Sequence, residues 1–296
     1  VCSSDLYTMF ENVSVIGGDL RQLTVAKLLK AEGYHVFLYG FDKDIQLETL
    51  ECETDKDLVL SADIVILPVP VTFDGNTINS PYAKEPMIID DFLSEINPSA
   101  LVFGGQIQPN LQKALEDNHI AYRDYLKREE LSIKNAVPTA EGAIEIAIAE
   151  TPFTIHGSKS LVLGYGKIGK ILSKDLYALG AQTYVEARKY ADLAMIEGHG
   201  YEPLPLDNLK DHIHEFDIIF NTIPSLILDD EILTKVKKDA LIIDLASKPG
   251  GIDFDAAKSY GLKVIWALSL PGKIAPVSSG AIIKDTIMNI IKELGV

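Results

Sequence analysis

The chain has 296 residues, of which 47% are hydrophobic and 24% charged, as in an ordinary folded globular protein. This is about twice the length of a typical single domain, so we expect two domains, each with its own core. The formal net charge of −16 argues against nucleic-acid binding, which needs a basic face. Any small anion must therefore meet a locally basic site or a set of backbone N–H groups.

Cys2 and Cys52 are the only cysteines, and they form neither a disulfide framework nor a metal motif. No apolar run reaches the 18 residues of a membrane span. The segment 1–5 has neither the basic start nor the apolar stretch of a signal peptide, and we exclude it from the fold. These observations favour a cytoplasmic protein with no membrane segment.

In the first half of the chain, short apolar runs alternate with amphipathic stretches, the pattern of β-α-β units on a parallel sheet. We expect strands over 13–16, 35–39, 64–67 and 101–103, and a helix over 20–32. They form an N-terminal domain over 6–137.

A connecting helix is expected over 138–151, because Pro138 precedes a long apolar stretch. Beyond it, a Rossmann domain is expected over 152–275. Its predicted elements are strands over 160–163, 182–187, 218–221, 241–245 and 263–267, and a helix over 167–179. A C-terminal helix is expected over 276–296, and the sequence does not indicate to which of the two domains it returns. The fold class is therefore α/β, with two Rossmann-like domains.

The segment Gly164-Tyr165-Gly166-Lys167-Ile168-Gly169 follows an apolar strand and opens a helix, the context of a dinucleotide-binding motif. Its first glycine permits a tight turn, its second lets the backbone approach a pyrophosphate, and its third lets helix and strand pack closely. These six residues are the predicted cofactor loop.

The end of the next strand indicates which cofactor binds, because an acidic residue there favours NAD and cations favour NADP. The aligned position is Ala187, and Arg188 and Lys189 follow it. This pattern favours NADP over NAD. Two other interpretations remain open: Glu186 takes the acidic role if the alignment slips by one residue, or the two cations are merely solvated.

Two later loops are expected to line the cofactor site, since ligands lie beyond the carboxyl ends of parallel strands. The first carries Asn221, Thr222, Ile223 and Pro224; the second carries Asp244, Ala246, Ser247 and Lys248. Thr222 and Ser247 offer hydroxyls, and Lys248 offers a cation near the nicotinamide. The alternative for Asn221 and Asp244 is that they only cap turns.

Together these motifs resemble the family of the dipicolinate synthase A subunit. The matching segments are 13–22, 40–42, 66–69, 138–142, 154–158, 221–225, 244–251 and 270–272. The resemblance implies a fold like that of D-2-hydroxyacid dehydrogenases and S-adenosylhomocysteine hydrolase. It also implies oxidation of dihydrodipicolinate to dipicolinate with NADP, together with a flavoprotein-like B subunit, in the cytoplasm of the mother cell of a sporulating bacterium. Lys248 and Val277 depart from the family pattern, which often has Arg and a basic residue there.

Such a reaction needs contacts for two carboxylates of a small dicarboxylate substrate and a route for one proton. For the carboxylates we expect the turn of Gly17 and Gly18, whose helix N-terminus and Arg21 suit an anion, together with Lys248 and Lys273. Arg21 is alternatively a surface helix residue. Asp19, Glu141 and Lys248 are the candidates for proton transfer, and the sequence does not choose among them.

Two other functions remain as alternatives. A D-2-hydroxyacid dehydrogenase would use a late histidine, and residues 266–276 contain none. A catalytically silent NADP-binding regulatory subunit is the second alternative. The six histidines show no metal or triad spacing, so no metal site is expected, and a homo-oligomer remains open.

Overall fold

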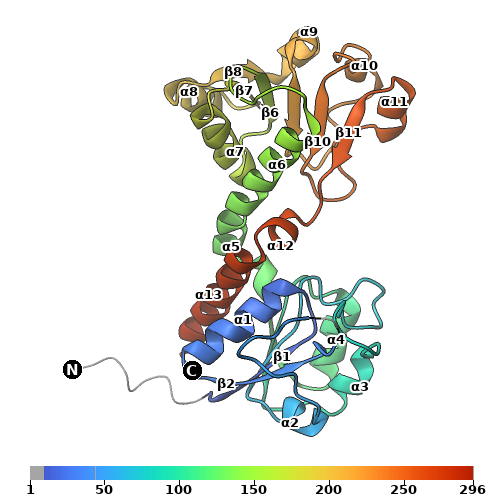
Figure 1. Ribbon diagram of the computed structural model, residues 1–296, viewed down its shortest axis with the longest axis vertical. Helices are drawn as coiled ribbons and strands as arrows, with labels where there is room; N and C mark the ends of the chain where they lie inside the picture. Colours follow the sequence, from blue (N-terminus) through green and yellow to red (C-terminus); the bar gives the residue numbers. More distant parts are fainter. Residues whose placement is uncertain (1–9, 44, 296) are drawn as a thin grey trace, which may run out of the picture. The chain divides into compact units, whose positions relative to one another are not determined.

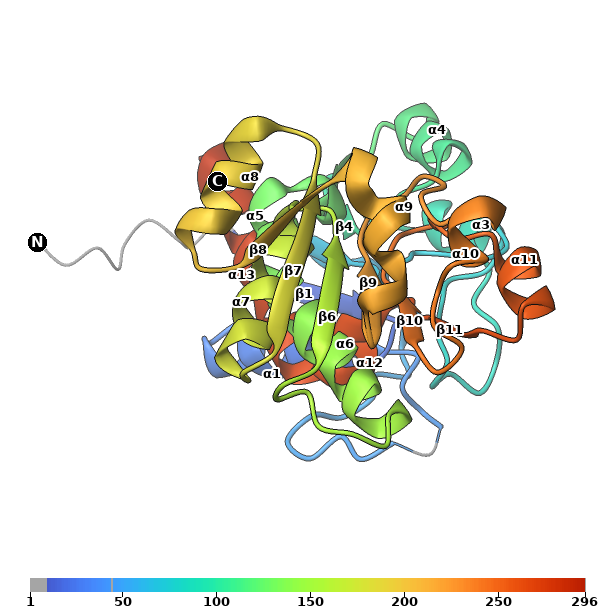
Figure 2. The same ribbon diagram turned by 90° about the horizontal axis from the view of Figure 1, so that it is seen from above.

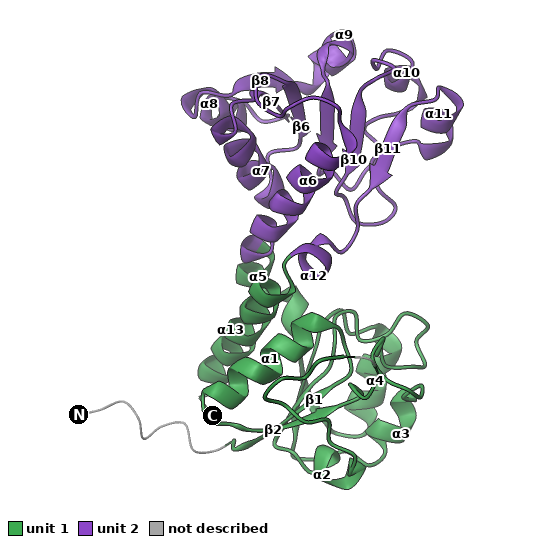
Figure 3. Ribbon diagram, viewed as in Figure 1, with its two compact units in different colours: residues 1–132, 275–296 green, residues 133–274 purple. Residues whose placement is uncertain are grey.

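The computed structural model describes residues 10–43 and 45–295 (Figure 1). The segment 1–5, Cys2 and the expected domain start at residue 6 lie outside the described residues. The chain divides into two compact units, residues 1–132 with 275–296, and residues 133–274 (Figure 3). The C-terminal helix therefore belongs to the first unit. We describe each unit by itself.

Unit 1 contains a parallel five-stranded sheet in the order β2-β1-β3-β4-β5. Its strands are β1 (Asn12–Ile16), β2 (His35–Tyr39), β3 (Ile64–Ile66), β4 (Leu101–Gly104) and β5 (Ala121–Asp124). Its helices are α1 (Leu20–Ala31), α2 (Lys56–Leu60), α3 (Ile89–Leu93), α4 (Pro109–Asp117) and the short η1 (Tyr125–Lys127), while α5 (Glu129–Lys134) crosses the unit boundary. The central strands are fully buried, as the apolar runs predicted.

Helix α13 (Pro276–Leu294) lies beside α1 in unit 1 (Figure 1). The two backbones approach closely at Gly280, where a Cβ atom would lie 2.6 Å from the carbonyl oxygen of Arg21. Ile283, Ile287 and Ile290 of α13 are buried in the same core as β1 and β3. The last helix thus completes a core that begins with the first strand.

Unit 2 contains a parallel six-stranded sheet in the order β11-β10-β9-β6-β7-β8, which Figure 2 shows from above. Its strands are β6 (Lys159–Leu163), β7 (Gln182–Ala187), β8 (Glu202–Pro205), β9 (Ile218–Asn221), β10 (Leu241–Asp244) and β11 (Lys263–Trp266). Its helices are α6 (Ala136–Glu150), α7 (Lys167–Ala178), α8 (Tyr190–Gly198), α9 (Leu209–His212), α10 (Asp230–Leu233), α11 (Phe254–Ser259) and α12 (Leu270–Ile274), with short turns η2 (Leu206–Asn208) and η3 (Ile213–Glu215). The strand order reverses between β6 and β9, and ligands of such sheets bind at that point.

The predicted strands and the two-domain α/β class are confirmed, with strand ends within one residue of those expected. Two edge strands were missed. β5 has half-exposed and charged residues, and β8 contains Pro203 and Pro205, which an edge strand tolerates and a sequence pattern counts against. The helix expected over 138–151 runs over Ala136–Glu150, and its buried alanines pack in the core of unit 2.

None of the described helices is long and apolar enough to cross a membrane. Across residues 10–43 and 45–295, no group of three or more His, Cys, Asp or Glu side chains is placed to hold a metal ion.

Candidate functional site

The glycine loop between β6 and α7 is shaped by close contacts at two of its three glycines. A Cβ atom at Gly169 would lie 2.0 Å from the carbonyl oxygen of Gly164, and one at Gly164 would lie 2.7 Å from Oγ1 of Thr222. Gly164 also has a φ of +92°, which favours glycine. At Gly166 a Cβ atom would meet nothing within 4 Å, so its surroundings are open.

Helix α7 starts at Lys167, and its N-cap residue, Gly166, has no side chain to cap it. The first N–H groups of a helix have no partner within the helix, and the helix dipole makes this end partially positive. An open, uncapped N-terminus after a glycine turn is therefore suited to a phosphate group. The residues present fit a dinucleotide.

Tyr165 is the aromatic residue of the glycine loop, and it is 8% exposed. Its hydroxyl oxygen lies 2.8 Å from Nδ1 of His199, the residue that ends α8, and the ammonium of Lys170 lies 5.3 Å from its ring centre. Tyr165 therefore anchors the loop to the rest of unit 2. No local pattern pointed to His199, because its partner is 34 residues away.

The end of β7 brings cations to the same edge of the sheet. Ala187 is 5% exposed and packs in the core, whereas Arg188 and Lys189 are exposed. Neither cation makes a hydrogen bond or an ion pair with another part of the chain that the structure describes. By contrast, Arg21 and Arg128 are both ion-paired. Arg188 and Lys189 are thus available to an anionic ligand.

Glu186, the alternative to Ala187, is 1% exposed and turns back toward the glycine loop. Its Oε2 accepts a hydrogen bond of 3.1 Å from the N–H of Gly164. Burial raises the pKa of the Glu186 carboxyl, while that N–H and the charge of Arg188 act in the opposite direction. Both Glu186 and Arg188 therefore lie at the predicted cofactor loop.

Asn221 and Asp244 are completely buried and hydrogen-bonded to each other, with 2.8 Å between Nδ2 and Oδ1. Asn221 also donates to the carbonyl oxygen of Ile223 and accepts from its N–H. Asp244 accepts from the N–H groups of Ala246 and Gly251. This pair ties together the loops that follow β9 and β10. These hydrogen bonds position the two loops, and a contact of Asn221 or Asp244 with the cofactor stays a prediction.

The rest of these loops divides into anchoring and exposed groups. Thr222 donates its hydroxyl proton to the carbonyl oxygen of Leu163 at 2.8 Å, so the loop after β9 is fixed to β6. Pro224, Ser247 and Lys248 are exposed. The ammonium of Lys248 makes no hydrogen bond or ion pair within the described ranges.

The glycine turn of unit 1 differs from what the sequence suggested. Gly17 and Gly18 donate their N–H groups to the carbonyl oxygens of Tyr39 and Asn79, at 2.9 and 2.7 Å. Asp19 caps α1, and Gln22 completes a capping box by accepting from the N–H of Asp19. These donors are engaged within the protein, so the expectation that this turn offers them to an anion is corrected.

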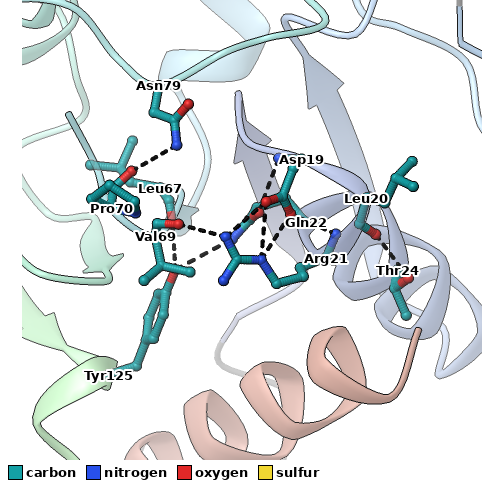
Figure 4. A network of polar contacts seen from close by, with 10 residues as sticks. All are labelled: Asp19, Leu20, Arg21, Gln22, Thr24, Leu67, Val69, Pro70, Asn79 and Tyr125. Atoms are coloured by element: carbon teal, nitrogen blue, oxygen red, sulfur yellow. Dashed lines mark hydrogen bonds and ion pairs between the residues drawn. The ribbon is translucent and has the colours of Figure 1, made fainter. Parts of the chain in front are cut away.

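Arg21 is held in a polar network rather than on the surface (Figure 4). Its guanidinium forms a two-pronged ion pair with Asp19 and donates to the carbonyl oxygen of Val69 at 2.7 Å. Tyr125 and Gln22 extend the network to the carbonyl oxygen of Leu67. The side chain of Arg21 is 13% exposed, and its Nη1 makes no hydrogen bond with the residues that the structure describes.

Glu141 lies away from the cofactor loop. It lines a groove of about 630 Å³ between α6 and α7, together with Asp175 and Leu179. Asp175 follows Gly166 by about two and a half helical turns, so this groove is not at the glycine loop. Burial raises the pKa of the Asp175 carboxyl, and the charge of Glu141 adds to the effect. Lys273 of α12 is exposed.

Comparison with known proteins gives two family matches. Residues 12–126 match the N-terminal domain of the dipicolinate synthase A subunit, and residues 146–265 match the shikimate / quinate 5-dehydrogenase family. The crystal structure of D-lactate dehydrogenase from Escherichia coli is similar in fold alone, with a TM-score of 0.60, 13% identity, and coverage of 94% of this chain and 95% of that one.

Two similarities extend over nearly the whole chain. The dipicolinate synthase A subunit of Bacillus subtilis is 35% identical over 288 residues, which are 95% of this chain and 96% of the relative. The crystal structure of the dipicolinate synthase A chain from Bacillus subtilis has a TM-score of 0.86 at 34% identity and covers 98% of both chains. The chain therefore belongs to the family of the dipicolinate synthase A subunit.

Proposed function

We propose that this chain is an NADP-linked oxidoreductase, the subunit of a dipicolinate synthase that oxidises dihydrodipicolinate to dipicolinate. Family membership supports the activity and the substrate class. The uncapped N-terminus of α7, beside the exposed cations that follow β7, is the observation that supports the cofactor.

The oxidation converts a dihydropyridine ring to an aromatic one, so the substrate loses a hydride from one ring carbon and a proton from another. When bound, NADP⁺ supplies the hydride acceptor. In the proposed mode, the backbone N–H groups of α7 hold the pyrophosphate, and Arg188 and Lys189 hold the 2′-phosphate. The hydrogen bond between Asn221 and Asp244 keeps the two loops in place.

The substrate contacts are proposed from the cations that the protein does not itself neutralise. Lys248 and Lys273 of unit 2, as ammonium groups, each suit a carboxylate. Lys248 is also a candidate for accepting the ring proton, a role that requires its neutral amine and so excludes the carboxylate contact by the same group in that step. Asp19 is a weaker candidate for proton transfer than the sequence suggested, because its carboxylate caps α1 and forms an ion pair with Arg21. Any substrate contact of Arg21 is assigned to its Nη1 group.

A second subunit is part of the proposal, because the relative's name makes it one component of a larger enzyme. We propose that the partner is the flavoprotein-like B subunit and that the two act in the cytoplasm of the mother cell. Closure by a partner would exclude water and strengthen the charge interactions at the site.

The experiment is a binding titration followed by an activity assay. Calorimetry should show NADP binding by the purified chain alone, and the ultraviolet absorbance of dipicolinate should rise strongly only after the flavoprotein-like partner is added. Absence of NADP binding would overturn the cofactor assignment. NADP binding without dipicolinate formation, even with that partner present, would instead identify a catalytically silent subunit.

A further inference from the structure

Three buried side-chain atoms lack a hydrogen-bond partner among the described residues: Oδ1 of Asn135, Oγ of Ser173 and Oε1 of Glu186. Only the last belongs to a carboxylate. Burying a carboxylate oxygen without a partner costs free energy, because the oxygen loses its hydrogen bonds to water and gains none within the protein.

Glu186 lies at the carboxyl end of β7, where its backbone pairs with Leu163, the last residue of β6. The residue after Leu163 is Gly164, whose N–H holds the other carboxylate oxygen. In a dinucleotide-binding sheet, the ribose of the adenosine lies at this edge, between the glycine turn and the end of the second strand. The last torsion of a glutamate is soft, so the carboxyl can turn its unpaired oxygen toward a ligand at little cost.

We propose that Glu186 is a second specificity-determining residue, which accepts a hydrogen bond from the 2′-hydroxyl of the adenosine ribose in NAD. The site then recognises both cofactors, NAD through Glu186 and NADP through Arg188 and Lys189. This inference rests on the proposed function, since it places the same dinucleotide at the same loop.

Glu186 favours NAD, whereas Arg188 and Lys189 favour NADP. These opposite effects reduce the difference in affinity between the two cofactors. A 2′-phosphate brings negative charge beside a carboxylate, and the charge of Arg188 stabilises both of them. We therefore expect the two dissociation constants to differ by less than about tenfold. A chain with the same cations but no carboxylate at this position would prefer NADP more strongly.

The first test changes the ligand and leaves the protein intact. Calorimetry compares NAD with its 2′-deoxyadenosine analogue, which lacks only the hydroxyl that Glu186 is proposed to bind. The analogue should bind about tenfold more weakly, as for the loss of one charge-assisted hydrogen bond. Equal affinity for NAD and the analogue would overturn the proposal.

The second test repeats both titrations with Glu186→Gln, which keeps the shape and an acceptor for Gly164. This variant should bind NAD about tenfold more weakly, bind NADP at least as well as the parent, and lose most of the difference between NAD and the analogue. Glu202→Gln is the matched control, because it removes one exposed charge from the amino end of the neighbouring strand β8. If Glu202→Gln shifts the preference equally, the effect is one of net charge and the assignment fails.

The outcomes separate this inference from the proposed function. If the unmodified chain binds neither NAD nor NADP, the dinucleotide site itself is refuted. If NADP binds and the 2′-hydroxyl has no effect, only the role of Glu186 is refuted. The comparison of NAD with its analogue decides the point even if Glu186→Gln does not fold.

Discussion

Both units place a strand, a glycine turn and a helix at the corresponding point of a parallel sheet, and the two turns have opposite characters. In unit 1 the N-terminus of α1 is closed by Asp19 and Gln22, and the turn donates its N–H groups to nearby carbonyls. In unit 2 the N-terminus of α7 has no side-chain cap. The N-terminus of α7 therefore lacks the side-chain cap that closes α1, and an uncapped helix N-terminus suits an anion.

The cations next to these turns follow the same division. Arg21 is neutralised by Asp19 within its own turn, whereas Arg188 is exposed and forms no ion pair in the described part of the chain. An arginine already bound to a carboxylate has little to offer a second anion. We therefore propose that the turn of unit 2 binds the cofactor, whereas the hydrogen bonds of the turn of unit 1 stabilise its own fold.

The largest expected effect comes from Gly169→Ala. Its Cβ atom would lie 2.0 Å from the backbone oxygen of Gly164, and backbone cannot move aside cheaply. We expect unit 2 to lose more than about 4 kcal/mol of unfolding free energy and to lose NADP binding. Thermal unfolding with and without NADP identifies the transition of unit 2, because a ligand stabilises only the unit that binds it. An unchanged transition would show that the loop has another conformation.

Gly166→Ala should separate binding from stability. A Cβ atom there meets nothing within 4 Å and the φ of −83° suits alanine, so the unfolding free energy should fall by no more than about 1 kcal/mol, the cost of alanine in place of glycine at an N-cap. The added methyl group would stand where the pyrophosphate approaches the backbone, so calorimetry should show NADP binding at least tenfold weaker. If NADP affinity stays at the parental value, the pyrophosphate does not bind at this turn.

Asp19→Ala should produce the opposite pattern. Removing the cap of α1 should cost about 1–2 kcal/mol in urea unfolding and leave the dissociation constant of NADP unchanged. Asp19→Asn is the control, since asparagine caps helices as well as aspartate: it should recover the part of the loss that comes from the cap, and the remaining loss measures the ion pair with Arg21. A large loss of NADP affinity in Asp19→Ala would contradict the division of roles between the turns.

The smallest effect concerns pH. Because burial raises the pKa of Glu186 in the folded state, ionising this carboxyl destabilises the fold above its folded pKa, and the cost disappears as pH falls toward the ordinary value of 4.5. Glu186→Gln without ligand should therefore raise Tm by at most a few degrees at pH 8, with the gain shrinking at pH 5. A gain that is the same at both pH values would indicate that ionisation of Glu186 is not its cause.

The sequence predicted the central strands and the glycine loop because these depend on local patterns: buried apolar runs and glycine spacing. We did not predict that the turn of unit 1 is engaged, although the cap of α1 is local: Asp19 and Gln22 stand three residues apart in the sequence. The hydrogen bond from Gly18 to the backbone carbonyl of Asn79 and the contact of Tyr165 with His199 join residues far apart in the chain, and no local pattern shows them. Glu186 stands one residue before Ala187, the position that we aligned with the residue selecting between NAD and NADP. Only the fold shows that the Glu186 carboxyl turns back to the N–H of Gly164.

The return of α13 to unit 1 has a consequence for how the chain folds during synthesis. Ile283, Ile287 and Ile290 belong to a core whose first strand is β1, yet the ribosome makes all of unit 2 before it reaches them. Unit 2 is continuous in sequence and can complete its own packing first. The nascent unit 1 must meanwhile keep an apolar face of α1 uncovered, which makes it the part that most needs a chaperone before release.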